Sequence, residues 1–323
     1  MVMLAMAMGL DSITGEAIMV LGGAIGFSTG TFNMFTTVVA QDIAELPAYS
    51  GLWYRAVCFV VFYIVTNWYL IRYAKKIKKN PTMSPMFDLD QEMKAEEATM
   101  DLDAASELTG RMLTPLVLLV IAFAVIIYGA IVLKWGMAHM AAMFLTYSVV
   151  ADLMIGTPVN TVCKDILDGS KQMLGAAFII GMATAISGIM DAGKITYTIV
   201  HATSELLSGL PPIIIAPGMV LANTLINLFL TSGSGQAVAV MPILIPLADV
   251  LGVTRQTTVL AFNFGDGFCN YILPTSTALM GTLSVTNIPY DRWMRFMWKL
   301  FLIWLVTGCV MTFIAQMIHL GPM

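Results

Sequence analysis

The sequence predicts an all-α polytopic membrane protein with two inverted repeats, a re-entrant hairpin and broken helices. Three observations carry this prediction. The 323 residues are 58% hydrophobic and only 11% charged, whereas soluble domains carry about 25% charged residues. The hydrophobic residues form stretches long enough to cross a bilayer, where α-helices satisfy their own backbone hydrogen bonds. Glycines and polar residues interrupt two of these stretches.

The apolar stretches define the expected elements. The piece at 2–10 is too short to span a bilayer. Amphipathic helices at the membrane surface are expected at 157–171 and 194–208. Spans are expected at 15–43 with a break near 26–33, and at 53–71, 113–133, 137–156, 172–190, 255–287 and 293–317.

The distribution of Lys and Arg predicts the topology. A basic run, Arg72–Lys79, precedes an acid-rich polar segment that extends to Arg111. If the 72–111 loop is placed in the cytoplasm, most Lys and Arg residues fall on the cytoplasmic side, as the positive-inside rule requires.

Residues 212–231 and 236–250 are two apolar arms joined by the polar turn Ser232–Gly235. The second arm is short, so we expect this segment to dip into the bilayer and return to the same side. The long span at 255–287 is expected to break at Gly265–Thr277, where glycines, hydroxyl residues and a proline gather.

An internal repeat is indicated by the order of these elements. An offset that places Leu10 on Leu251 aligns a short arm, a polar turn, a broken span and a full span in both halves. We therefore expect 1–79 to be the C-terminal part of a first inverted repeat. Residues 80–112 would be a cytoplasmic linker, and 113–323 the second repeat, with its hairpin at 212–250 and its broken helix at 255–287. Residues 2–10 would then be the returning arm of a first hairpin, so the first repeat is expected to be incomplete. Inverted repeats with broken helices are typical of secondary transporters.

The turn Ser232, Gly233, Ser234, Gly235 and Gln236 is the first candidate binding element. It precedes an apolar helix, and a helix N-terminus presents free N–H groups and about half a positive charge. Such an end suits a carboxylate, although the same residues also suit an ordinary flexible loop.

Asp266, between Gly265 and Gly267, is the candidate ion-coupling residue. An ionisable group within a membrane span marks a functional site by default. The carboxylate could bind Na⁺, carry a proton or pair with a substrate ammonium, or it could partner a helix end structurally. Further candidates for substrate binding surround the two breaks: Asn270, Thr275, Ser276, Thr277, Ser28, Thr29 and Asn33.

Other polar residues are expected to have structural roles. Asn223 and Asn227 lie four residues apart on the first arm and are interpreted as contacts that join helices. The cysteines, histidines and methionines show no metal-ligand spacing. A solvated surface position is expected for Asp11, Glu16, Asp42 and Glu45.

Several motifs together resemble the C4-dicarboxylate anaerobic carrier family, in its YfcC-like branch of the ion transporter superfamily. They are Ser232–Pro242, Thr254-Arg-Gln256, Phe264–Phe268, Asn270, Pro274–Ser276 and, in the first half, Ala5–Asp11, Gln41, Ala44–Pro47 and Arg72–Lys76. The resemblance covers essentially the whole chain. It implies an inverted-repeat transporter fold, a substrate held between hairpin tips and helix breaks, and assembly as a homodimer. The missing first hairpin tip departs from the family pattern.

These observations predict a secondary active transporter, by symport or exchange, for an amino acid or a C4-dicarboxylate. Na⁺ or H⁺ is the expected coupling ion, no other cofactor is expected, and the location is the bacterial cytoplasmic (inner) membrane. An ion channel and an inactive fragment or split subunit remain alternatives. Enzymatic function is not expected, because no metal constellation or catalytic dyad is present, and nucleic-acid binding is not expected, because no basic patch with interleaved aromatics occurs.

Overall fold

The computed structural model describes residues 1–98, 110–131, 133, 137–195, 198, 201–202, 205 and 211–321, and these residues form helices without β-strands. The chain divides into two compact units. The larger comprises Met1–Asp90 and Gly175–Met323, and the smaller comprises Gln91–Leu174. The expected all-α membrane architecture is confirmed. The division into two repeats and a linker stays a prediction.

The smaller unit contains the helices α6 (Gly110–Ile131) and α7 (Met137–Ile155). They are antiparallel, since Tyr147 in α7 donates a hydrogen bond to Pro115 O near the start of α6, at 3.1 Å, whereas Phe144, earlier in α7, packs on Phe123, later in α6, with ring centroids 5.8 Å apart.

Helix α8 (Val159–Ala192) is continuous over 34 residues and belongs partly to each unit. The expectation of a surface helix at 157–171 followed by a separate span at 172–190 is therefore wrong. Gly169 and Ser170 do not end the helix: Ser170 Oγ donates back to Ile166 O, at 2.8 Å. The helix expected at 194–208 lies largely outside the described residues.

The first broken helix consists of α2 (Ser12–Thr29), the π-helix η1 (Met34–Val38) and α3 (Val39–Ile43). Helix α2 ends at Gly30, which adopts the left-handed conformation with φ 66° that favours glycine. The side chain of Asn33 then caps η1 by accepting from the backbone N–H of Phe35 and Thr36. The break is thus shorter than the expected 26–33 and begins at Gly30.

The second broken helix consists of α12 (Arg255–Cys269) and α13 (Thr277–Val285). Thr254 caps α12 and Ser276 caps α13 through their hydroxyl groups. At about 1.5 Å per residue, α12 is about 22 Å long, shorter than the ~30 Å hydrocarbon core. The expectation that the break begins at Gly265 is wrong, because the helix persists to Cys269.

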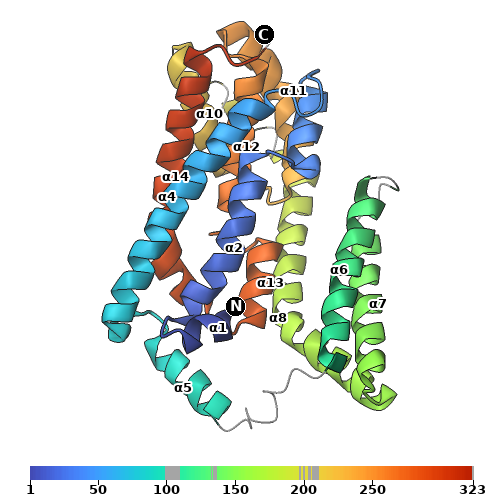
Figure 1. The fold of residues 1–323 in the computed structure, drawn as a ribbon. Helices are drawn as coiled ribbons and strands as arrows, with labels where there is room; N and C mark the ends of the chain where they lie inside the picture. The colour runs from blue at the N-terminus through green and yellow to red at the C-terminus, as the bar shows by residue number, and fades with distance from the viewer. Residues whose placement is uncertain are drawn as a thin grey trace. The chain divides into compact units, whose positions relative to one another are not determined.

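The hairpin consists of α10 (Pro212–Asn227) and α11 (Gly233–Leu251). Helix α10 runs toward the break in α12. Cys309 Sγ of α14 (Tyr290–Met317) lies 3.8 Å from Pro217 O in the first half of α10, and Cys269 Sγ at the end of α12 lies 3.7 Å from Thr224 O in its second half. Helix α11 ends three residues before α12 begins. Both arms therefore lie on the same side of the break in α12, and Figure 1 shows them together in the upper half of the larger unit. Re-entry of this hairpin stays a prediction, because α11 has 19 residues and is long and apolar enough to cross a membrane.

Helices α4 (Leu52–Lys79) and α14 (Tyr290–Met317) form a long antiparallel pair. Tyr54 donates to Met311 O at 2.6 Å and Tyr69 donates to Phe296 O at 2.7 Å, at opposite ends of the pair. Helix α4 continues past the expected end of the span at residue 71, so the basic run Arg72–Lys79 is helical. The 3₁₀ turn η2 (Pro81–Met83) and α5 (Phe87–Ala98) follow.

The two halves share one local structure at the start of each broken helix. Helix α1 (Val2–Ala7) is followed by Gly9, with φ 78°, and α11 is followed by Gly252, with φ 73°. Leu10 N donates to Ala5 O, and Val253 N donates to Ala248 O, both at 2.9 Å. Asp11 and Thr254 then cap the next helix. This match places Leu10 on Val253 and corrects the sequence alignment by two residues.

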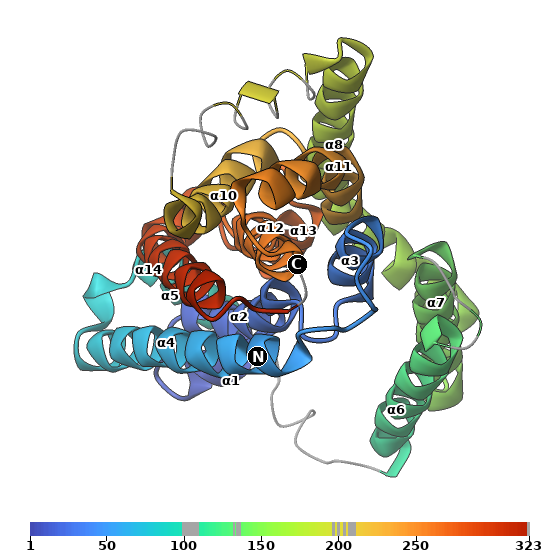
Figure 2. The ribbon, with the colours of Figure 1, turned by 90° about the horizontal axis from the view of Figure 1, so that it is seen from above.

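Helix α12 occupies the centre of the larger unit. It packs against α2, α10, α11 and α14, which Figure 2 shows surrounding it. The aromatic rings of Phe62, Phe268 and Trp304 stack at this centre, with centroids 4.5 and 4.7 Å apart. Trp293 Nε1 donates to Tyr271 O at 3.0 Å and so attaches the second break to α14.

Gly265 permits the close approach of α10 to α12, and its replacement tests this packing. A Cβ at Gly265 would lie 2.5 Å from Asn223 Cβ and 2.8 Å from Val220 O. We expect Gly265→Ala to destabilise the detergent-solubilised protein by about 1–3 kcal/mol, through overpacking. Gly22→Ala is the matched control, because a Cβ there meets nothing within 4 Å and the substitution favours helix. Thermal unfolding measures both; equal melting temperatures for the two variants would contradict the assigned contact.

Candidate functional site

Asp266 is the centre of a buried polar cluster that joins three helices. Its side chain is 0% exposed. Asn227 Nδ2, at the end of α10, donates to Asp266 Oδ1 at 2.7 Å and to Gln236 Oε1 at 2.8 Å. Gln236 Nε2, in the first turn of α11, donates to Asn223 Oδ1 and Asn223 O at 3.3 and 3.2 Å. The hairpin is therefore fastened to α12 through the carboxylate of Asp266.

Several buried oxygens near the two breaks have no hydrogen-bond partner among the described residues. Asp266 Oδ2 and Asn227 Oδ1 are two of them. Buried polar atoms are normally hydrogen-bonded, so unpaired ones indicate a strained or ligand-binding position. The others around the breaks are Ser28 Oγ, Asn263 Oδ1 and Thr275 Oγ1.

The tip of the hairpin lies directly against Asp266. A Cβ added to Gly233 would be 2.9 Å from Asp266 Oδ2 and 2.5 Å from Thr36 Cγ2. Gly233 is also the first residue of α11, with Ser232 as its cap. The positive end of the α11 dipole is therefore adjacent to the carboxylate.

The first broken helix reaches the same level. A Cβ on Gly267 would lie 2.6 Å from Ser28 Oγ, and one on Gly30 would lie 2.5 Å from Asn263 Nδ2. Asn263 Nδ2 also donates to Thr37 Oγ1 at 3.0 Å. Helices α2 and α12 thus cross antiparallel at the height of Asp266, with the two breaks on opposite sides of the crossing.

The structure brings together only part of the set expected from the sequence. Close to Asp266 lie Gly233, Gln236, Gly265 and Gly267, and Ser28 contacts Gly267. Ser234 and Gly235 are in the first turn of α11 but are exposed.

Other expected site residues use their side chains for local structure. Asn270 Nδ2 donates to Asp266 O at 3.1 Å, Thr29 Oγ1 donates to Ile25 O at 2.8 Å, and Ser276 caps α13. Thr277 is exposed. Their part in substrate binding stays a prediction.

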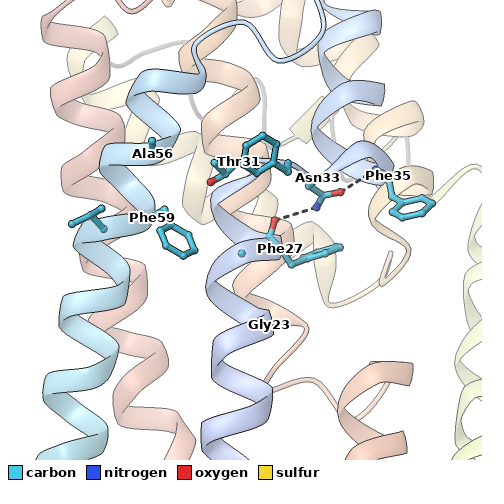
Figure 3. Close-up of a pocket in the computed structure, with 10 residues that line it drawn as sticks. Gly23, Phe27, Thr31, Asn33, Phe35, Ala56 and Phe59 are labelled. Carbon is cyan, nitrogen blue, oxygen red and sulfur yellow. Dashed lines mark hydrogen bonds between the residues drawn. The ribbon is translucent and has the colours of Figure 1, made fainter. Parts of the chain in front are cut away.

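Asn33 lies beside a separate apolar cavity of about 670 Å³. Residues of α2, the first break, η1 and α4 line it, among them Gly23, Phe27 and Phe59. Figure 3 shows the Asn33 amide turned to the backbone, donating to Phe27 O at 3.1 Å and accepting from Phe35 N at 3.0 Å. This cavity offers hydrophobic contact rather than groups for a carboxylate.

Several amide and hydroxyl side chains that were not expected in the site lie close to Asp266. Asn227 does join helices, as expected, but it does so by contacting Asp266 directly. Thr36, Thr37 and Asn263 belong to the same buried level and were missed as candidates, although Asn263 lies three residues before Asp266, about one helical turn away.

Two acidic residues expected at a solvated surface are buried. Asp11 caps α2 and accepts from Tyr73 and Ser84 through Oδ2, at 2.6 and 2.7 Å. Glu16 is fully buried in α2, and its oxygens have no hydrogen-bond partner in the described residues. That expectation is therefore wrong for both, because α1 and the helices of the second half cover this end of α2. Asp42 and Glu45 are exposed, as expected.

The bond between Asn227 and Asp266 can be tested by removing its donor. We expect Asn227→Leu to lower stability by about 1–3 kcal/mol, because Asp266 Oδ1 and Gln236 Oε1 would lose their shared partner. Asn67→Leu is the control, since Asn67 Nδ2 makes only an exposed bond to Tyr63 O. Chemical unfolding in detergent measures the difference; a loss no greater than that of the control would show that the cluster is not stabilising.

Comparisons with known proteins give the chain its family. A protein of Escherichia coli (strain K12), described as "Putative basic amino acid antiporter YfcC", is 34% identical over 303 residues, which cover 90% of this chain and 59% of that protein. An uncharacterised protein of Haemophilus influenzae is 29% identical over 307 residues, which cover 95% of this chain and 60% of that protein. The chain thus spans about three-fifths of the length of these relatives. No solved structure matches it.

The family model of the C4-dicarboxylate anaerobic carriers matches residues 1–317. The apolar helices, the broken helices and the polar cluster at their centre agree with a membrane transporter. The chain belongs to the C4-dicarboxylate anaerobic carrier family.

Proposed function

We propose that this protein is a secondary active transporter of a small carboxylate-bearing solute, and that Asp266 couples transport to a cation. Within that class we favour an amino acid, including a basic one, over a C4-dicarboxylate. The family name supports a carboxylate, and the description of the E. coli relative supports a basic amino acid. We also propose the bacterial cytoplasmic membrane as its location and a homodimer as its assembly, on the family resemblance.

The observation that carries the proposal is the uncompensated carboxylate of Asp266. Burying an ionised carboxylate costs several kcal/mol unless it is paired with an opposite charge. Asn227 supplies one neutral hydrogen bond, and no salt bridge reaches Asp266 from any described residue. Since no described residue supplies the balancing charge, we infer that it comes from a proton, from Na⁺ or from the ammonium of a solute.

The position of the α11 N-terminus beside Asp266 couples binding of the cation to binding of the solute carboxylate. The N–H groups of Gly233 and Ser234 open α11 and suit an anion. A solute carboxylate bound there would be close to Asp266 Oδ2 and would be repelled by an ionised Asp266. Neutralisation of Asp266 therefore favours solute binding, which is the thermodynamic requirement for coupling.

The composition of the site favours an amino acid as the solute. An α-amino acid brings one carboxylate for the α11 N-terminus, and its own ammonium can take the place of the proton or Na⁺ that neutralises Asp266. A dicarboxylate would place two negative charges in a cluster that contains no Lys or Arg among its described residues. Helix N-termini alone can hold carboxylates, so the dicarboxylate is the second candidate and enters the same experiment.

Removal of the charge on Asp266 tests the mechanism directly. We expect Asp266→Asn, reconstituted in proteoliposomes, to lose cation dependence and to reduce counterflow of arginine by at least about 100-fold, the size of a ~3 kcal/mol loss. Expression is expected to persist, because an amide can still bond Asn227. Asp42→Asn, at an exposed carboxylate, is the control.

The transport assay also separates the alternative functions. Saturable uptake with counterflow identifies a carrier, whereas flux that does not saturate identifies a channel. Arginine and succinate are each tested as the trapped solute. Unchanged, cation-dependent counterflow in Asp266→Asn would remove this residue from the mechanism.

The tip of the hairpin provides a second test. We expect Gly233→Ala to abolish ligand-induced thermal stabilisation, because its Cβ would occupy space beside Asp266 Oδ2 and Thr36. Gly235→Ala is the matched substitution, since its Cβ meets only the side chain of Ser232, at 3.1 Å and beyond. A thermal-shift titration with arginine and succinate compares them. If Gly233→Ala shows the shift of the unsubstituted protein, the solute does not bind at this tip.

A further inference from the structure

A second cavity, of about 290 Å³, lies at the end of the larger unit where α4 ends and α14 begins. We propose that this cavity binds the phosphate headgroup of an anionic membrane lipid. It is separate from the Asp266 cluster, which lies at the breaks of the helices. The proposal requires only that the chain resides in a membrane and does not depend on which solute it carries.

Four cationic side chains line the cavity: Arg72 and Lys76 from α4, and Arg295 and Lys299 from α14. In the part of the chain that the structure describes, Arg72, Lys76 and Lys299 form no salt bridge. Arg295 has only a long contact with Asp291, at 3.6 Å. The excess of positive charge around one small cavity therefore remains to be balanced by an anion.

Two tyrosine hydroxyl groups beside the cavity already donate hydrogen bonds to other protein groups, so they are not available to a ligand. The ring of Tyr69 lines the cavity, while its hydroxyl donates to Phe296 O at 2.7 Å. Tyr73 also lines it and donates its hydroxyl proton to Asp11 Oδ2 at 2.6 Å. The polar groups that stay available are the guanidinium and ammonium groups, which bind phosphate through charge-assisted hydrogen bonds.

The surroundings of the cavity indicate that the anion belongs to a lipid. Exposed apolar side chains continue from it along α14, at Leu302 and Val306, which follow Lys299 by three and seven residues and so share its face of the helix. An acyl chain can pack along this row while the phosphate occupies the cavity. A soluble anion would make no use of it.

Aromatic residues mark the same level as a membrane–water boundary. Trp68 and Trp298 are largely exposed, and tryptophan is enriched at bilayer interfaces. Arg72 lies 5.5 Å from the ring centre of Trp68, and Lys299 lies 5.5 Å from that of Trp298. These cation–π contacts hold two of the cations at the headgroup level. Basic pockets between transmembrane helices are known to bind anionic headgroups.

The size of the cavity agrees with a headgroup. At about 290 Å³ it is at the lower end of the range of small-molecule pockets, about 300–1,000 Å³. It is too small for a whole lipid and large enough for a phosphate with its glycerol. We therefore name phosphatidylglycerol, with its single phosphodiester charge, as the probe.

The test is a titration of the detergent-purified chain with dioleoyl phosphatidylglycerol, read as bound lipid by native mass spectrometry. We expect Arg72→Gln/Lys299→Gln to bind about 25-fold more weakly, at about fivefold per removed charge. Lys75→Gln/Lys78→Gln removes the same charge from the same helix outside the cavity and is expected to change binding by less than about twofold. Circular dichroism confirms that all variants are folded.

Each further outcome decides the proposal. Preference for phosphatidylglycerol over phosphatidylcholine, lost only in the cavity variant, supports it. Equal weakening in both double variants would show a diffuse surface charge effect and would overturn it. Displacement of the lipid by millimolar inorganic phosphate would assign the cavity to a soluble anion and would also overturn it. Lipid binding and arginine counterflow are separate measurements, so failure of one does not imply failure of the other.

Discussion

The structure depends on one constraint: a carboxylate buried among apolar helices, with no cation paired to it among the described residues. Asp266 is held by Asn227, and Asn227 in turn holds Gln236, so three helices meet on a single charged group. Neutral hydrogen bonds orient the carboxylate, but they do not supply the charge that its burial requires. In the mechanism that we propose, a bound proton, Na⁺ or ammonium balances this charge, and the need for such a cation links the packing of the helices to transport.

The broken helices make it possible to place a polar cluster such as that of Asp266 within the membrane-spanning part of the protein. The helix ends at the two breaks and at the hairpin tip have their backbone groups satisfied locally, by the caps Asn33, Ser232 and Ser276 and by the left-handed Gly30. Non-helical backbone is tolerated within a membrane only when protein encloses it. The surrounding long pair, α4 and α14, provides that enclosure and is itself fixed by hydrogen bonds such as Trp304 Nε1 to Thr66 Oγ1, at 2.8 Å.

Much of this arrangement could be predicted from local sequence. Glycines, prolines and hydroxyl residues within apolar stretches identified both breaks and the hairpin, because these residues have few other uses there. The partners of Asp266 could not be predicted in the same way. Asn227 and Gln236 meet it only through the packing of α10 and α11 on α12.

The errors have related causes. The span expected at 53–71 ends too early, because Lys and Arg are good helix formers and α4 continues through Arg72–Lys79. Glu16 was taken for a surface residue because of its position near a predicted helix end, and only tertiary packing buries it. The sequence of α8 changes from polar to apolar near residue 171 and was therefore predicted to form two helices, but nothing at Gly169 ends the helix.

The most direct test of the central claim is the infrared absorption of the Asp266 carboxyl group, isolated as a difference between the unsubstituted protein and a variant with asparagine at that position. The account predicts that this absorption changes when Na⁺, protons or the solute are supplied, because one of them balances the charge. An ionised carboxylate band that responds to none of the three would contradict it.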